Sequence, residues 1–240
     1  MLVTLKSDWG VNWLLPAVYV TADAGGAARA ACRGQVVMIV DVIDMSTVCE
    51  AALDEGALAV YGAAPDDASP PVPVDQVRVG RLAGEHACSF NAGVILIAEP
   101  RVGSDRERLS AVQKVLRGVR ESGANVEAVL PNLGAETVKL ADFQRRVVVV
   151  ATKAGGVAFD AALTGGAPAV LTGTVARTVK KSGPACALAA ARRACAAARQ
   201  HQKDIAIVAA SANSLEDVLA AEYIFKLILK RTRTRIVNRQ

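Results

Sequence analysis

The stretch VVMIVDVIDMSTVCEAAL, residues 36–53, decides the fold class. Five consecutive apolar residues, 36–40, run directly into Asp41. A short continuous apolar run is typical of a strand that is buried on both faces, as strands are in parallel sheets. A helical pattern begins at about residue 47, after two carboxylates and two hydroxyls. The segment therefore predicts a buried parallel strand that leads into a helix.

The same alternation continues along the chain and predicts a single α/β domain over residues 1–240. Because helical stretches fall between most of the apolar runs, we expect a three-layer α/β/α fold with a mainly parallel or mixed sheet. The predicted strands are 36–40, 57–61, 94–98, 126–130, 147–151, 169–171 and 205–209, and the predicted helices are 47–55, 104–122, 157–164, 184–201 and 214–230. Residues 11–22 are interpreted as a further first strand, and residues 64–76, with four prolines, as an exposed connector.

Charge is concentrated at one end of the chain. The net charge is +5, and the tail 230–240 contains five Lys or Arg residues and no acid, so the remainder is neutral. A solvated chain end explains such a tail most simply. No aromatic residue is interleaved in the tail, and no nucleic-acid-binding motif occurs elsewhere. A nucleic-acid partner is therefore the least favoured of the functions considered.

Cysteine usage and hydropathy indicate a cytoplasmic protein. The five cysteines are odd in number and none forms a C-x-x-C pair, which is typical of free thiols in a reducing compartment. No uncharged apolar run reaches the ~18 residues that a membrane-spanning helix needs, so no membrane partner is expected.

Polar residues that follow the predicted strands are the candidate site residues. Ligands of open parallel α/β sheets bind at the carboxyl ends of the strands. Asp41 is the strongest candidate, because a carboxylate that prolongs a buried strand is costly unless it is paired or bound to a metal. The other candidates at strand ends are Asp44, Ser46, Thr47, Thr152, Lys153, Gly155, Gly156, Thr172, Gly173, Thr174, Ser211, Asn213, Ser214, Glu216 and Asp217.

Several of these residues also have purely structural explanations. The patterns Thr47-x-x-Glu50, Ser104-x-x-Glu107 and Ser214-x-x-Asp217 match capping boxes. Carboxylates such as Glu216 and Asp217 are also favoured in the first turn of a helix by its dipole. The two glycines at 155 and 156 fit a tight turn.

Taken together, the strand-end residues predict a cation beside an anion cradle. Converging carboxylates suit a hard cation such as Mg²⁺. Backbone N–H groups at the helix starts near Ser46, Gly156 and Ser214 suit a phosphate. This combination indicates phosphoryl chemistry assisted by a metal. The chain has no GxxxxGK[ST] or GxGxxG motif, so nucleotide binding is not predicted.

Three stretches resemble the 2-phosphosulfolactate phosphatase family, Mg²⁺-dependent α/β enzymes linked to coenzyme M biosynthesis. VVMIVDVIDMSTVCEAALDEGA resembles the family's Asp-Val-Leu-Arg-Ala-(Ser/Thr)-Thr-Thr segment and its helix. RRVVVVATKAGGVAFDAA with APAVLTGT resembles the strand ending in Thr-Thr-Asn-Gly-Thr and the strand after it. DIAIVAASANSLEDVLAAEYIFKLI resembles the closing strand and Ser-Leu-Glu-Asp helix, and RLAGEHA (81–87) resembles a Gly-Glu segment more loosely.

The resemblance implies an Mg²⁺-dependent hydrolase of a small phosphorylated (sulfo)carboxylic acid. The positions that match the family pattern are Asp41, Ser46, Thr47, Glu85, Gly155, Glu216 and Asp217. From the strand-end positions and the resemblance together, the expected catalytic residues are Asp41, Asp44 and Glu216. The expected metal ligands are Asp41, Glu85, Glu216 and Asp217. The expected substrate-binding residues are Ser46, Thr47, Lys153, Gly155, Gly156 and Ser214.

The chain also departs from the family pattern at positions that matter for catalysis. Asp44 stands where the family has Arg, Ala154 where it has Asn, and Gly156 where it has Thr. An arginine would clamp an anion, whereas Asp44 would repel it unless a metal intervenes. Residues from about 88 to 135 follow the family poorly and are expected to form a strand–helix–strand insertion. A non-catalytic ligand-binding or scaffold protein on the same fold is therefore an alternative.

The last predicted helix favours self-association. Its segment LAAEYIFKLILK becomes apolar on more than one face towards its end. A homo-oligomer is expected, and a dimer is the commonest form.

Overall fold

The computed structural model describes residues 16–237, with side chains described as far as residue 230. The strands are β1 (Val18–Ala22), β2 (Val36–Val40), β3 (Ala59–Ala63), β4 (Val94–Ala98), β5 (Val126–Pro131), β6 (Val147–Ala151), β7 (Val170–Gly173) and β8 (Ile205–Ala209). The helices are α1 (Asp23–Cys32), α2 (Ser46–Asp54), α3 (Gln76–Ser89), α4 (Asp105–Ser110), α5 (Gln113–Glu121), the 3₁₀ helix η1 (Gly134–Lys139), α6 (Gly155–Thr164), α7 (Ala185–His201) and α8 (Leu215–Val237).

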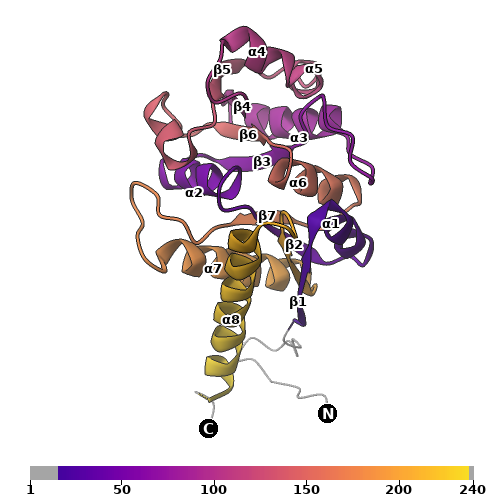
Figure 1. Cartoon of the computed structure of the whole chain (residues 1–240), viewed down its shortest axis with the longest axis vertical. Helices are drawn as coiled ribbons and strands as arrows, with labels where there is room; N and C mark the ends of the chain where they lie inside the picture. The colour runs from indigo at the N-terminus through magenta and orange to yellow at the C-terminus, as the bar shows by residue number, and fades with distance from the viewer. Residues whose placement is uncertain (1–15, 238–240) are drawn as a thin grey trace.

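These strands form two parallel sheets of four strands each (Figure 1). The first sheet has the order β1-β8-β2-β7, and the second has the order β3-β6-β4-β5. Every strand pair in the described part of the chain is parallel, including β2 with β8, which aligns Val40 with Ala209. Strands that are parallel neighbours present their carboxyl ends at the same edge, so Asp41 and the residues after β8 share one rim.

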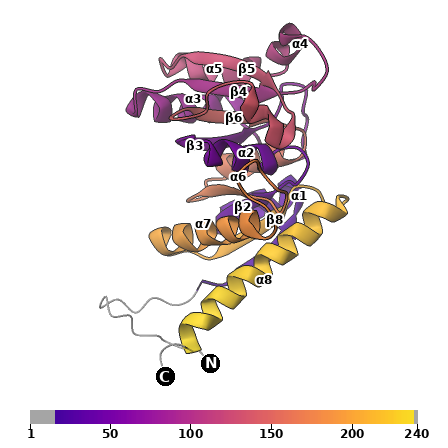
Figure 2. The ribbon, with the colours of Figure 1, turned by 90° about the vertical axis from the view of Figure 1, so that its left-hand side faces the viewer.

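Helices cover both faces of each sheet, and the two sheets share their middle layer (Figure 2). One core cluster joins α1, α2 and α6 to the inner faces of both sheets. A second cluster packs α7 and α8 on the outer face of the first sheet, and a third packs α3 and α5 on the outer face of the second. Each sheet is thus the centre of an α/β/α stack, which confirms the predicted three-layer α/β class. The division into two sheets was not predicted.

Two helices that the sequence analysis missed, α1 and α3, are rich in alanine or glycine. Glycine disfavours an isolated helix, which explains why the α3 segment gave no helical signal. In the structure the glycines allow α3 to contact α5 closely. A Cβ atom on Gly80 would lie 2.1 Å from the carbonyl oxygen of Val115, and one on Gly118 would lie 2.0 Å from that of Val77. Tertiary packing therefore outweighs the low helix propensity of this segment.

The segment from about 88 to 135 belongs to the second sheet. It contains β4, α4, α5 and β5, so the single helix predicted over 104–122 is divided into two, with a break at 111–112. β4 pairs with both β5 and β6. The segment is therefore a strand–helix–helix–strand unit, and it supplies one central strand and one edge strand.

The three predicted capping boxes have different outcomes. Ser104 and Glu107 form the reciprocal capping box at α4. At α8, the N–H of Asp217 donates to Ser214 Oγ over 3.3 Å, while the Asp217 carboxylate turns elsewhere. At α2 the prediction is wrong, because the helix already begins at Ser46 and Glu50 is fully buried in an ion-pair network.

Within residues 16–237, no helix is long and apolar enough to cross a membrane. The first predicted strand, 11–22, corresponds to β1 over 18–22, and its residues before 16 lie outside the described part. Likewise, the side chains of the basic tail beyond residue 230 lie outside the described part.

Candidate functional site

The candidate site is built around Asp41, which lies 3% exposed at the carboxyl end of β2. Its Oδ1 accepts the backbone N–H of Asp44 over 2.8 Å, and its Oδ2 accepts the N–H of Gly155 over 2.9 Å. The second contact joins β2 of the first sheet to the start of α6, which follows β6 of the second sheet. Asp41 thus fixes the position of one sheet's rim relative to the other.

Burial dominates the ionisation of Asp41. The pKa of its carboxyl is raised from 3.8 to about 6, mainly by desolvation, and the hydrogen bond from the Asp44 N–H offsets this rise only in part. The neighbouring charges of Asp217 and Asp44 contribute to the same rise. A carboxyl whose pKa approaches neutrality can both hold and release a proton at physiological pH.

Asp217 lies at the same rim, as the sequence predicted. Its Oδ1 accepts the N–H of Val42, the residue that follows Asp41, over 2.8 Å. The side chain is 4% exposed, and burial raises its pKa above the ordinary value. Residues from the first quarter and the last tenth of the chain therefore meet in one acidic pair.

Hydroxyl groups line the rim beside this pair. Thr47 Oγ1 lies 2.9 Å from Thr174 Oγ1 and donates to the carbonyl oxygen of Val42 over 2.5 Å. Ser46 is fully buried, and its Oγ accepts the Asp41 N–H and donates to the Ile39 carbonyl. Ser46 therefore supports the loop after β2, while Thr47 and Thr174 are almost fully enclosed by their neighbours.

The glycines after β6 do not offer free backbone donors. The N–H of Gly155 donates to Asp41, and that of Gly156 donates to Thr152 Oγ1 over 2.8 Å. Ser214 likewise caps α8 through its hydroxyl. The expectation of an open anion cradle at the start of α6 is wrong, because both amides are satisfied inside the protein. A Cβ atom on Gly155 would lie 2.2 Å from Asp41 Oδ2, so this glycine serves the close approach.

Asp44 brings a guanidinium group to the rim. Its Oδ1 lies 2.6 Å from Arg101 Nη2, and both side chains are less than half exposed. Arg101 also lies 3.5 Å from Glu99. Arg101 is not among the predicted site residues, although it follows the end of β4 by three residues and the strand-end rule could have found it. The Asn132 side chain, which follows β5, donates to the Asp44 carbonyl over 2.6 Å and secures the same loop.

Lys153 belongs to a neighbouring cleft rather than to the Asp41 site. Its Nζ lies 2.6 Å from Asp67, and both side chains are largely exposed. The cleft, of about 630 Å³, opens at the carboxyl ends of β3, β4 and β6. Its charged lining consists of Asp66, Asp67, Glu99 and Lys153. A role for Lys153 as a phosphate ligand beside Asp41 is therefore not supported by its contacts.

The four predicted metal ligands are not brought together. Glu85 is exposed on α3, which covers the outer face of the second sheet, away from the strand that carries Asp41. Glu216 is exposed, and its carboxylate makes no hydrogen bond or ion pair with any residue that the structure describes. Within residues 16–237 there is no group of three or more His, Cys, Asp or Glu side chains that could hold a metal ion.

Of the four predicted metal ligands, Asp41 and Asp217 are the two that lie at the same rim and could hold a metal ion. Mg²⁺ commonly binds proteins through one or two carboxylates and takes its other oxygens from water and substrate phosphate. The oxygen-only chemistry of the rim fits such a sparse site. A cation there would also relieve the repulsion by which Asp217 raises the pKa of Asp41.

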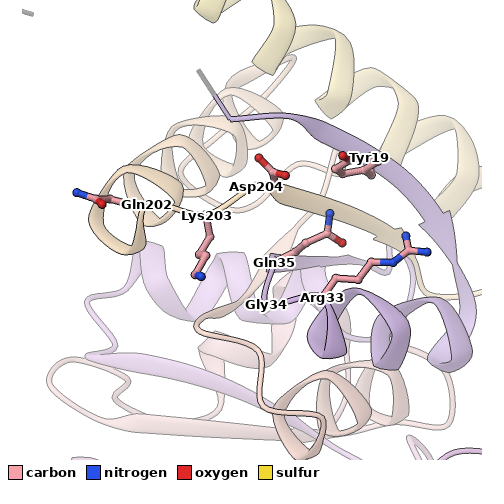
Figure 3. A pocket seen from close by; sticks show the side chains of 7 residues that line it. All are labelled: Tyr19, Arg33, Gly34, Gln35, Gln202, Lys203 and Asp204. Atoms are coloured by element: carbon pink, nitrogen blue, oxygen red, sulfur yellow. The ribbon is translucent and has the colours of Figure 1, made fainter. Parts of the chain in front are cut away.

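A further hollow lies at the opposite, amino-terminal edge of the first sheet (Figure 3). It measures about 390 Å³ and is lined by residues before β2 and β8, including Arg33, Lys203 and Asp204. Asp204 Oδ1 accepts the N–H of Ala17 there, which helps to hold the start of β1. The hollow contains none of the predicted site residues.

The raised pKa of Asp41 predicts a pH-dependent cost in stability. The pKa of Asp41 is about 6 in the folded protein and 3.8 ordinarily. The contribution of its protonated carboxyl to the free energy of unfolding is therefore fully present below pH ~4 and is lost as the pH rises through ~6. We expect Asp41→Asn to remove this loss of about 3 kcal/mol. Urea unfolding of both proteins from pH 4 to 7 should show the variant gaining stability relative to wild type. A difference that stays constant over this range would contradict the buried, protonatable carboxyl.

A search of protein-family models and a search of curated proteins each found no match to the chain.

Proposed function

We propose that the protein hydrolyses a small phosphorylated carboxylic or sulfocarboxylic acid with Mg²⁺ at the rim around Asp41, as the resemblance to 2-phosphosulfolactate phosphatases implies. One observation carries the proposal: a buried carboxyl with a pKa of about 6 lies beside a second buried carboxyl at the carboxyl ends of parallel strands. This is the place where α/β folds bind ligands, and a buried carboxyl that is costly to ionise without a partner suits a ligand of a cation.

Asp41 and Asp217 are the residues that would hold Mg²⁺. When bound, the ion would polarise a phosphoryl oxygen and offset its charge. Asp41 is oriented by the N–H groups of Asp44 and Gly155, so its carboxyl needs no rearrangement to act. In the proposal Asp41 holds the ion as a carboxylate, so binding of Mg²⁺ would displace its proton.

Arg101 supplies the positive charge that the family pattern would have at position 44. Its guanidinium is anchored by Asp44 and Glu99 and remains 44% exposed, so donors stay available to a ligand. A guanidinium binds carboxylate and phosphate as a rigid fork. We infer that Asp44 positions Arg101 and does not itself repel the substrate.

The test is phosphate release by the purified chain with Mg²⁺ or Mn²⁺. The substrates are 2-phosphosulfolactate, 2-phospholactate and phosphoglycolate. We expect Asp41→Asn to lower turnover at least ~100-fold, because loss of an outer-shell partner of a metal ligand already costs about 10–100-fold and Asp41 would itself be a ligand. Arg101→Gln should raise KM about 10-fold through loss of a charge-assisted contact. Arg117→Gln, which alters an exposed arginine on α5, is the matched control.

No release of phosphate from any of these esters with either metal would refute the proposed hydrolase activity.

A non-catalytic ligand-binding protein is the second candidate. It is favoured by the internal use of the Gly155 and Gly156 amides, which leaves few donors for a phosphoryl group. Calorimetry showing binding of 2-phospholactate without turnover would support it.

We further propose that the protein is a cytoplasmic homo-oligomer. All five cysteines are free thiols in the structure, and two of them, Cys49 and Cys186, are buried. Burial raises the pKa of the Cys186 thiol, which keeps it unreactive.

A further inference from the structure

Helix α8 lies on the outside of the first sheet and carries two different faces. One face is buried against the sheet and α7 through Ala220, Ala221, Ile224 and Ile228. On another face, Leu219 is 55% exposed and Tyr223 is 41% exposed. Figure 2 shows α8 as the outermost layer, with its carboxyl half extending beyond the sheet. The face of α8 that carries Leu219 and Tyr223 is therefore an apolar surface that no described element covers.

The exposed face has a sequence pattern that is symmetric about Tyr223. Leu219 and Leu227 lie four residues before and after it, and Glu216 and Lys230 lie seven residues before and after it. Steps of three and four residues place all five on one stripe of a helix. Leu227 is partly buried, and Glu216 and Lys230 are exposed. The stripe is therefore apolar in the middle, acidic at one end and basic at the other.

We propose that a second copy of the chain covers this stripe, with the two α8 helices antiparallel about a two-fold axis at Tyr223. In this arrangement Tyr223 packs against Tyr223 of the partner subunit. Leu219 packs against Leu227 of the partner subunit, and Glu216 meets the partner's Lys230. A two-fold interface uses the same patch twice, so a patch that is symmetric in this way matches itself.

Charge selects the antiparallel orientation and a copy of this chain as the partner. A parallel pair would place Glu216 against the partner's Glu216 and would align the helix dipoles unfavourably. The free carboxylate of Glu216 gains a cation in the antiparallel pair. Glu216, whose carboxylate has no hydrogen-bond or ion-pair partner among the described residues, thus gains a role in the proposed assembly.

The test is a charge exchange between positions 216 and 230, followed by sedimentation velocity of the full chain from about 1 to 100 µM, the range expected for a small interface. Wild type is expected to form a reversible dimer of twice the 24.9 kDa chain mass. Glu216→Lys or Lys230→Glu alone should weaken the dimer about 10-fold, because each creates two like-charge contacts. The double variant should restore the dimer to within about 3-fold of wild type.

The rescue is specific to an intermolecular contact. Positions 216 and 230 are separated by about 21 Å along one helix and cannot compensate each other within a chain. Glu222→Lys, which changes the same charge outside the stripe, is the matched control and should leave dimerisation within about 3-fold of wild type. Leu219→Glu should produce a monomer whose unfolding temperature equals that of wild type at concentrations where wild type is also monomeric, since Leu219 is largely exposed.

Three results would overturn the proposal. The first is a wild-type monomer at every concentration. The second is a dimer for which the double variant is no better than either single variant, which would indicate another interface such as the exposed Tyr19 and Val20 of β1. The third is a chain that dimerises only after removal of residues 1–15, which would mean that this segment occupies the stripe.

Discussion

Gly155→Ala is expected to lower the free energy of unfolding by about 3 kcal/mol. The added Cβ would lie 2.2 Å from Asp41 Oδ2 and 2.8 Å from Asp41 Cβ. Neither atom can move away easily, because Asp41 is buried and held by the N–H of Asp44. The substitution therefore forces apart the contact between β2 and the start of α6. It should also abolish phosphate release if the Asp41 rim is the active site.

Equilibrium unfolding in urea measures the first effect, with Gly25→Ala as the control. Gly25 lies in α1, and the nearest atom to its added Cβ is the flexible end of Arg29 at 3.4 Å. Alanine is the better helix former, so this variant should gain up to about 0.5–1 kcal/mol. Equal small effects at both glycines would show that the 155 position is not tightly packed against Asp41.

Glu50→Gln is expected to destabilise the protein by about 3 kcal/mol, because it leaves two cations without their shared anion. Glu50 is fully buried in α2 and binds Lys181 Nζ over 2.5 Å and Arg193 Nη2. Lys181 lies in the loop after β7, and Arg193 lies in α7. Lys181 would retain Asp54, also at 2.5 Å, so the loss falls mainly on Arg193. Glutamine keeps the volume of the side chain, which separates the charge effect from packing.

The matched control is Glu222→Gln on the surface of α8. Its carboxylate lies 4.0 Å from Lys226, and both side chains are at least half exposed. Exposed pairs of this kind contribute little, so we expect a change within about 0.5 kcal/mol. Thermal unfolding of the two variants side by side should separate them by many degrees. Similar melting temperatures would mean that the buried network contributes no more than a surface pair.

The strands were predictable because burial on both faces leaves a continuous apolar run. β2, β4, β6 and β8 begin and end where the sequence analysis placed them. α3 was not predictable from local propensity, since its glycines serve a close contact with α5 that only the folded protein shows. The division into two sheets was also not predictable, because fully buried strands look alike whichever sheet they join.

The candidate site was partly predictable for a related reason. The rule that ligands bind at strand carboxyl ends, together with the parallel pairing of β2 and β8, brings Asp41 and Asp217 together. The rule does not say where a long side chain points, so Lys153 was assigned to the wrong cleft and Arg101 was overlooked. Glu85 was carried over from the family resemblance alone, and its helix covers a different face.

The order of strands in the two sheets has a consequence for biosynthesis. Residues 59–151 contain every strand of the second sheet, so that sheet can assemble while the rest of the chain is still being translated. β1 and β2, in contrast, pair only with β7 and β8, which are made near the end. Since translation adds about 5–20 residues per second, the apolar β2 segment waits for roughly 10–30 s before β8 has been made. The nascent chain is therefore expected to need chaperone protection at its amino-terminal strands until β8 leaves the ribosome.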